Sequence, residues 1–213
     1  MVDTKISALT AAASAASANE YAINEAGTSK KVTGTQITAL VKANMTLTFT
    51  DYIPCTMEVP NDTVSYPDVF TLGDAATKLT GIWLPNSGTS ALNFKCIVPF
   101  GLAGTPAGKI LIYMLPRTTV ANSTVNLTLS RLYVNDTEDC DAAYTAETAV
   151  DVNLTSTADF LTIYEYDLSA EPTAGELFEG LLTRTPGAAN DDFTEDLFIV
   201  AMVLKIDRAI TIA

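Results

Sequence analysis

Apolar and polar residues alternate with a period of two along most of the chain after residue 45, which is the pattern of half-buried β-strands. In residues 125–130, Val125, Leu127 and Leu129 share one face, and the intervening positions are polar. The run from Leu92 to Phe100 alternates in the same sense and turns Cys96 towards a core. Further strand-like runs cover residues 46–53, 109–115, 160–168, 177–183 and 196–207.

Turn-forming residues separate these runs, at 85–88, 101–108, 186–187 and 190–192. The pattern predicts seven or eight strands with long connecting loops and no amphipathic helix of normal length. An all-β fold follows: an antiparallel β-sandwich, jelly-roll-like, with an extended N-terminal segment. We expect two parts, an N-terminal attachment segment over residues 1–44 and a β-sandwich domain over residues 45–213.

Two of the expected strands, residues 109–115 and 197–206, are apolar on both faces. A sandwich strand needs only one apolar face, so another layer or another subunit must cover the second. The residues assigned to this covered face or oligomer interface are Leu197, Ile199, Val203, Leu111 and Tyr113. The pattern favours a homo-oligomer closed by rotation, and a covering loop is the alternative.

Charge divides the chain in the same place as the pattern does. The whole chain carries a net charge of −13, whereas residues 1–46 hold four lysines and three acidic residues, a net of +1. The N-terminal segment is rich in Ala and Ser over residues 9–18 and then contains two short β-like pieces, at 31–33 and 36–38. We interpret it as a segment that orders on a partner or within an oligomer, with a flexible tail as the alternative.

The composition excludes several function classes. The chain has no histidine, so hydrolases of the Ser-His-Asp or Cys-His type and His-containing zinc sites are ruled out. The acidic balance argues against nucleic acid as a partner. The three cysteines lack CxxC spacing and are expected to be free thiols. No signal peptide is visible, and the longest apolar run, residues 197–204, is too short for a membrane helix, so no membrane partner is expected.

Acid-rich loops at residues 135–141 and 190–196 are the only candidates for chemistry. Their oxygens suit a calcium ion, but neither loop has the spacing of a calcium-binding loop, so we interpret them as solvated turns. No pair of carboxylates is placed across a cleft for glycoside hydrolysis, and Trp83 is expected to pack at the edge of the sandwich rather than stack on a sugar. The sequence predicts no catalytic residue, no metal and no cofactor.

Two stretches resemble proteins of tailed bacteriophages. Lys5-Ile-Ser-Ala-Leu9, followed by Gly27-Thr-Ser-Lys-Lys-Val-Thr33 and Gln36-Ile37, resembles the N-terminal signature of many phage fibre and virion-attached proteins. Residues 174–184, 190–194 and 197–206 are similar to the closing strands of phage β-sandwich proteins, although Glu176 stands where Asp is usual.

The resemblance implies a non-enzymatic structural virion protein: a trimeric capsid decoration (cement) or head-fibre protein, made in the bacterial host cytoplasm and displayed on the outer surface of the capsid. Its partners would be further copies of itself and the major capsid protein. The implied capsid-attachment residues are Lys5, Ile6, Leu9, Lys30, Lys31, Val32 and Ile37. The alternative is a tail fibre or a tail-associated receptor- or carbohydrate-binding module that contacts a host-surface glycan.

Overall fold

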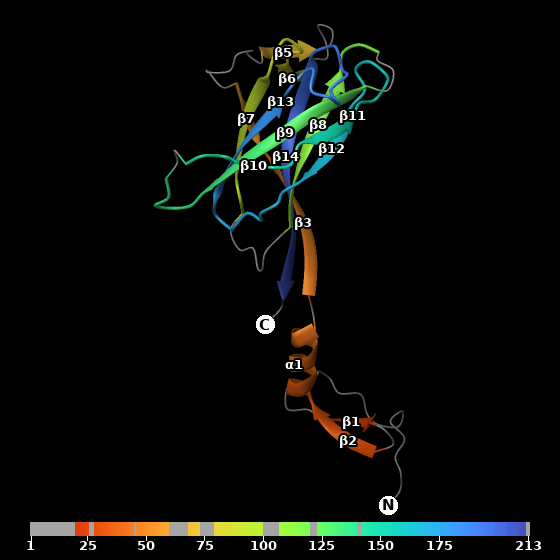
Figure 1. The fold of residues 1–213 in the computed structure, drawn as a ribbon. Helices are drawn as coiled ribbons and strands as arrows, with labels where there is room; N and C mark the ends of the chain where they lie inside the picture. Colours follow the sequence, from red (N-terminus) through yellow and green to blue (C-terminus); the bar gives the residue numbers. More distant parts are fainter. Residues whose placement is uncertain are drawn as a thin grey trace, which may run out of the picture. The chain divides into compact units, whose positions relative to one another are not determined.

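The computed structural model describes residues 20–25, 28–44, 46–59, 68–72, 79–99, 107–119, 123–139 and 142–211. Almost all regular structure in them is antiparallel β-sheet (Figure 1). The strands of the two large sheets are β3 (Thr46–Pro54), β4 (Thr56–Glu58), β5 (Asp68–Leu72), β6 (Leu79–Leu84), β7 (Ser90–Ile97), β8 (Ala107–Pro116), β9 (Thr124–Val134), β10 (Thr145–Ala146), β11 (Val150–Asn153), β12 (Thr162–Asp167), β13 (Leu177–Arg184) and β14 (Leu197–Thr211). Two further strands, β1 (Glu20–Glu25) and β2 (Thr28–Thr33), and one helix, α1 (Gly34–Asn44), precede them.

Two sheets face each other in a jelly roll, as the alternation predicts. One, here called the β14 sheet, has the order β12-β8-β14-β6-β5, and β3 also pairs with β14. The other, the β13 sheet, has the order β10-β9-β13-β7-β4, and β11 also pairs with β9. From β6 to β9 successive strands alternate between the sheets, and β12, β13 and β14 do so again, which gives the strand orders β6-β14-β8-β12 and β7-β13-β9-β11 of the jelly roll.

The core lies between the two sheets and is built by the alternating positions. Val125, Leu127 and Leu129 on β9 are completely buried, as are Leu92 on β7 and Leu182 on β13. Aromatic rings fill the middle of the core, where the centroids of Phe94 and Phe178 lie 5.6 Å apart. The period-two prediction of which residues face inward is therefore confirmed for β9 and β7.

A β-bulge in β14 changes which residues share a face. The pairing register between β14 and β8 shifts between Ile199 and Ala201. The extra residue on β14 at this point reverses which alternate side chains face the core. Leu197 and Ile199 consequently join Met202 in the main core, and Phe198 points to the outside of the sheet. The assignment of Leu197 and Ile199 to the same outer face as Val203 is wrong, because strict alternation does not allow for the bulge.

The first compact unit comprises Met1–Leu47 and Ile210–Ala213, and the second comprises Thr48–Ala209. In the first unit, β1 and β2 form a hairpin in which Glu25 pairs with Thr28, and α1 follows directly (Figure 1). Thr33 and Gln36 form a capping box: the Thr33 amide donates to Gln36 Oε1 (2.8 Å) and the Gln36 amide donates to Thr33 Oγ1 (3.2 Å). The β-like interpretation of residues 36–38 is therefore wrong, because this box starts a helix there.

The chain crosses from one sheet to the other between β3 and β4. β3 pairs with β14, whereas Thr56 on β4 pairs with Lys95 on β7 in the opposite sheet. Cys55 stands between them, and its amide donates to the carbonyl of Met202 on β14 (2.9 Å). In the described part of the chain, no helix is long and apolar enough to cross a membrane.

Candidate functional site

The first candidate surface is formed by β1, β2 and α1, which we call the hairpin–helix unit. It holds four of the seven residues implied in attachment. Lys30, Lys31 and Val32 lie on β2, where they pair with Ile23, Ala22 and Tyr21 of β1. Ile37 lies in the first turn of α1 and is 38% exposed. Lys5, Ile6 and Leu9 lie outside the described residues. The structure thus brings the second and third pieces of the sequence signature together in one small unit.

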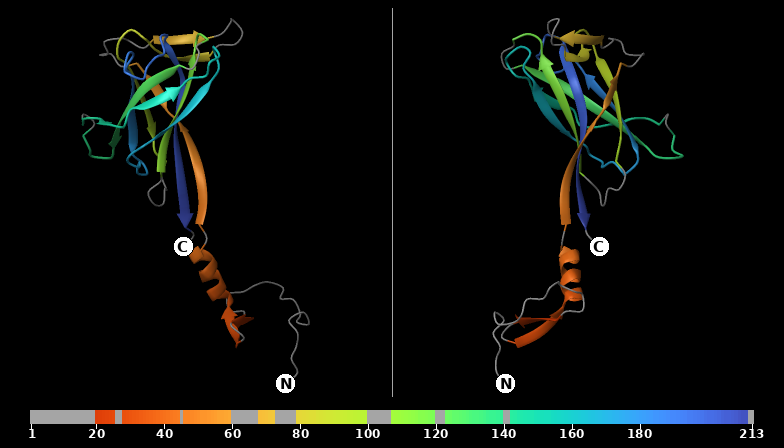
Figure 2. Two further views of the ribbon diagram at one scale, coloured as in Figure 1. Left: turned by 45° about the vertical axis from the view of Figure 1, so that its right-hand side comes forward. Right: turned by 180° about the vertical axis from the view of Figure 1, so that it is seen from behind.

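The second candidate surface is the outer side of the β14 sheet. We call it the outer β14 face and define it by Leu111, Tyr113, Ile163 and Val203. The pairing register places Tyr113 on β8 beside Ile163 on β12, and Leu111 beside Val203 on β14. Ile163 is 52% exposed, whereas Leu111 is buried. The rear view in Figure 2 looks onto this sheet.

Charged residues border the outer β14 face. Lys109 Nζ lies 3.0 Å from Asp167 Oδ1 and 3.3 Å from Glu165 Oε2, and Lys205 Nζ lies 3.1 Å from Glu165 Oε1. Hydrogen bonds from Lys205 and Lys109 hold the pKa of Glu165 below its ordinary value. These exposed pairs contribute little stability, so their effect is to place a polar border beside an apolar surface.

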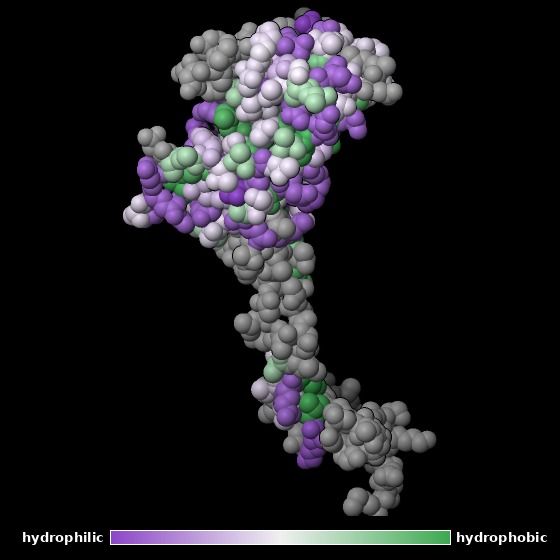
Figure 3. All heavy atoms as spheres, viewed as in Figure 1, coloured by the Kyte–Doolittle hydropathy of each residue, from purple (hydrophilic) through white to green (hydrophobic). Residues whose placement is uncertain are grey.

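The outer side of the β13 sheet is different in character. Asn126, Thr128 and Ser130 occupy the outward positions of β9, between buried neighbours. Figure 3 shows this side of the jelly roll, and its hydrophobic residues are scattered among hydrophilic ones. The two sheets therefore differ at these positions: the outward residues of β9 from 126 to 130 are polar, whereas the residues that define the outer β14 face are apolar.

Trp83 belongs to a small cluster on the outer side of the β14 sheet. Its ring centroid lies 4.7 Å from that of Phe198, Leu115 packs with both, and the Arg117 guanidinium carbon lies 5.9 Å from the Trp83 centroid. Only 8% of Trp83 is exposed. The indole ring is thus occupied by packing, as the sequence indicated, and has no open face for a sugar.

A third candidate surface is a pocket of about 290 Å³ at the edge of the sandwich. The lining residues are Glu147, Thr148, Val150, Tyr164, Tyr166, Asp167, Leu168 and Ser169. Tyr164 and Tyr166 meet edge to face, with centroids 6.2 Å apart. The Tyr166 hydroxyl donates to the Thr148 carbonyl and accepts from the Leu129 amide, so its ring is fixed in place.

Glu147 supports this edge pocket. Its Oε1 accepts from Arg131 Nε and from the Ser169 amide (3.2 Å), while Arg131 Nη2 donates to Ser169 Oγ (3.1 Å). Burial raises the pKa of Glu147, but the hydrogen bonds from Ser169 and Arg131 outweigh it and hold this pKa below the ordinary value. The carboxylate is therefore a fixed anion that joins the strand ends rather than a proton donor.

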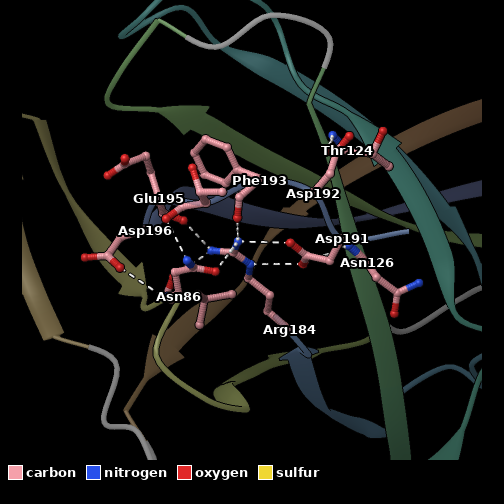
Figure 4. A network of polar contacts seen from close by, with 11 residues as sticks. Asn86, Thr124, Asn126, Arg184, Asp191, Asp192, Phe193, Glu195 and Asp196 are labelled. Carbon is pink, nitrogen blue, oxygen red and sulfur yellow. Dashed lines mark hydrogen bonds and ion pairs between the residues drawn. The ribbon is translucent and has the colours of Figure 1, made fainter. Parts of the chain in front are cut away.

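Figure 4 shows a buried arginine network at another end of the jelly roll. Arg184 is completely buried and forms two hydrogen bonds with Asp191, from Nε to Oδ2 (3.2 Å) and from Nη2 to Oδ1 (3.1 Å). Its remaining donors reach the carbonyls of Leu84, Phe193 and Glu195 and the Asn86 side chain. Every nitrogen of the guanidinium is satisfied, which leaves no donor for a ligand.

The acid-rich loop over residues 190–196 is mostly structural. Asp191 pairs with Arg184, Asp192 accepts from the Thr124 amide (2.6 Å), and Asp196 accepts from the Asn86 amide (2.9 Å). Asp191 is buried, so the interpretation of this loop as a solvated turn fails at that residue. Among the described residues, no group of three or more Cys, Asp or Glu side chains is arranged to hold a metal ion.

Sequence patterns did not reveal the edge pocket. Its walls come from the segment between β10 and β11, from the first residue of β11, from β12 and from the two residues that follow β12. β10 has two residues and β11 has four, too few for a period to be recognised. The only available signal was Tyr164 and Tyr166 at alternate positions, which is typical of many buried strands.

No protein-family model and no curated protein sequence matches the chain. Several solved structures are similar. The xylan-binding domain CBM22-2 from Paenibacillus barcinonensis has a TM-score of 0.42 and 8% identity, covering 70% of this chain and 91% of that chain. A carbohydrate-binding module specific for non-crystalline cellulose, CBM28, has a TM-score of 0.39 and 8% identity, covering 72% and 86%. A chain of infectious bursal disease virus, strain Gx, has a TM-score of 0.33 and 9% identity, covering 79% and 33%.

Proposed function

We propose that the chain is a non-enzymatic structural protein of a phage virion, a trimeric capsid decoration or head-fibre protein attached to the shell by its hairpin–helix unit. The observation that carries the proposal is this unit itself. A capped hairpin and helix belong to one compact unit, and the second compact unit is a jelly roll with a hydrophobic core of its own. A small unit of this kind gains stability by packing on a partner.

Charge supports the same division of roles. Residues 1–46 carry a net charge of +1, and the remaining chain carries −14, given the total of −13. An acidic jelly roll on the capsid surface would keep particles apart in solution. The lysine-bearing hairpin, with Lys30 and Lys31 adjacent on β2, is the part suited to contact the major capsid protein.

The test uses virions of the phage that encodes the chain, prepared without this protein and mixed with the purified full-length chain. We expect the wild type to co-sediment with the particles and Lys31→Glu to bind about tenfold more weakly, because like charges at an interface cost on the order of 1 kcal/mol or more. Lys95→Glu on β7 is the matched control and should bind as the wild type does. Absence of wild-type binding, or equal binding by Lys31→Glu, would contradict the proposal.

A second candidate function, binding of a host-surface glycan, is favoured by the edge pocket. The fixed ring of Tyr166 and the adjacent ring of Tyr164, beside the hydroxyl groups of Thr148 and Ser169, suit the mixed apolar and polar surface of a neutral sugar. If this pocket binds sugar, Tyr164→Ala should lose calorimetrically measured binding to neutral oligosaccharides such as cellohexaose or to the host polysaccharide. Tyr52→Ala, an exposed tyrosine outside the pocket, is the control. No binding by the wild type to either probe removes this candidate.

A further inference from the structure

Two cysteines face each other where the chain crosses between the sheets. On β4 and β7, Thr56 pairs with Lys95, Met57 with Phe94 and Glu58 with Asn93. Continuing this antiparallel register by one position places Cys55 opposite Cys96. Directly opposed residues on antiparallel strands have Cα atoms about 4.5–5.5 Å apart, which lies within the span of a disulfide.

Both side chains point to the same side of the sheet. Cys96 is a buried member of the main core, and Cys55 packs against that core while remaining half-buried. Both are free thiols in this structure. The two sulfurs therefore approach each other on the core side at the edge of the β13 sheet, where β4 is the last strand.

We propose that Cys55 and Cys96 form a reversible disulfide under oxidising conditions, which fastens the sheet-crossing segment to β7. The oxidant is a small disulfide such as oxidised glutathione. The Cys55 thiolate attacks one of its sulfurs and releases one glutathione thiolate, giving a mixed disulfide. Cys96, deprotonated in turn, then attacks the Cys55 sulfur, forms the Cys55–Cys96 bond and releases the second glutathione as a thiolate. Both thiol protons pass to the solvent, and two electrons reduce the oxidant.

The environment of the pair sets the order of these steps. A hydrogen bond with the Cys96 side chain lowers the pKa of Cys55, despite its burial, and the same bond together with burial raises the pKa of Cys96. Cys55 is also the more exposed of the two. Since the thiolate is the nucleophile, Cys55 is the residue that attacks first.

The disulfide would act where the non-covalent attachment is weak. β4 has three residues, and its side-chain ion pair, Lys95 Nζ to Glu58 Oε1 at 2.7 Å, is exposed. Short edge strands of this kind open locally more readily than central ones, and an exposed pair adds little. A bond between Cys55 and Cys96 would close a loop that contains β4, β5, β6 and most of β7, and would restrict that opening.

The test treats the full-length protein with oxidised glutathione or with dithiothreitol, blocks remaining thiols by alkylation and maps the peptides by mass spectrometry. We expect a mass loss of about 2 Da, a cross-linked peptide pair containing Cys55 and Cys96, and alkylation at Cys140. The oxidised protein should melt roughly 5–15 °C higher than the reduced one.

Variants separate this cross-link from other oxidation. Cys55→Ser should abolish both the cross-link and the shift in Tm, whereas Cys140→Ser should retain both. Three results would overturn the proposal: alkylation of Cys55 and Cys96 after oxidation, a stable glutathione adduct on Cys55 without closure, or a cross-link that involves Cys140. Because the wild type is mapped directly, the test does not depend on any variant folding.

Discussion

Arg184 and Asp191 are the clearest case of single residues that fix the position of loops. Their ion pair is fully buried and joins the end of β13 to the loop that precedes β14. The same guanidinium lies 5.2 Å from the centroid of the Phe193 ring and donates to two loop carbonyls and to the carbonyl of Leu84 at the end of β6. One side chain thus satisfies polar groups that would otherwise be buried without partners.

Arg184→Met should destabilise the jelly roll by about 3–5 kcal/mol, because it leaves the Asp191 carboxylate buried without a counter-ion. Urea unfolding at neutral pH measures this change. Lys95→Met, which removes an exposed ion pair, is the control and should change stability by less than about 1 kcal/mol. A cost for Arg184→Met as small as that of the control would show that Asp191 finds water or another donor.

The burial of Arg184 was beyond sequence analysis for a physical reason. Arginine is seldom fully buried unless it is paired, and its partner lies seven residues away in a loop whose acidic composition is equally typical of a solvated turn. The resemblance to phage β-sandwich proteins drew attention to residues 174–184 and 190–194 without indicating that the two stretches meet. Only the three-dimensional arrangement joins them.

At the scale of elements, long periodic strands were predictable and short or irregular ones were not. The predicted residues 177–183 became β13, and 125–130 form part of β9. The assignment of Leu197 and Ile199 was wrong because of the bulge in β14. The alternation of residues in the sequence does not show where a strand contains an extra residue. The start of α1 was missed although Thr33 and Gln36 have the spacing of a capping box, since β-branched residues around them favour strand.

The network around Glu147 predicts how these elements respond to acid. Its carboxylate joins β9 and the segment after β12, and its pKa is held below the ordinary value. Its contribution is therefore complete above a pH of about 4.5, the unfolded value, and is lost as the pH falls through the lower folded value.

Glu147→Gln should consequently be less stable than the wild type by about 1–3 kcal/mol at pH 7, and the difference should shrink below pH 4.5. Urea unfolding from pH 7 to pH 3 measures both effects. Glu171→Gln, at an exposed glutamate, should follow the wild-type curve within about 0.5 kcal/mol. A constant difference between wild type and Glu147→Gln over the whole range would contradict the electrostatic explanation.

The difference between the two outer faces matters at the scale of the whole molecule. The outward positions of β9 from 126 to 130 are polar and suited to water, whereas Tyr113, Ile163 and Val203 leave an apolar area on the β14 sheet. Such an area with a charged border is typical of a contact between subunits. Two of the five residues assigned to the interface, Leu197 and Ile199, lie in the core instead, so a contact on this face would involve the other three.

If copies of the chain associate through the outer β14 face, the full-length protein should have a mass near three times 22.6 kDa, about 68 kDa, by light scattering. Ile163→Lys should shift it towards the monomer, because a lysine at a closely packed apolar contact must be desolvated without a partner.

Ile97→Lys is the matched control: Ile97 is 62% exposed at the end of β7 in the other sheet, so this variant should keep the wild-type mass. Circular dichroism should show the same β-sheet signal in all three proteins. A monomeric wild type at micromolar concentration, or equal loss of association in both variants, would place the contact elsewhere and leave Tyr113, Ile163 and Val203 as an apolar surface that serves a different partner.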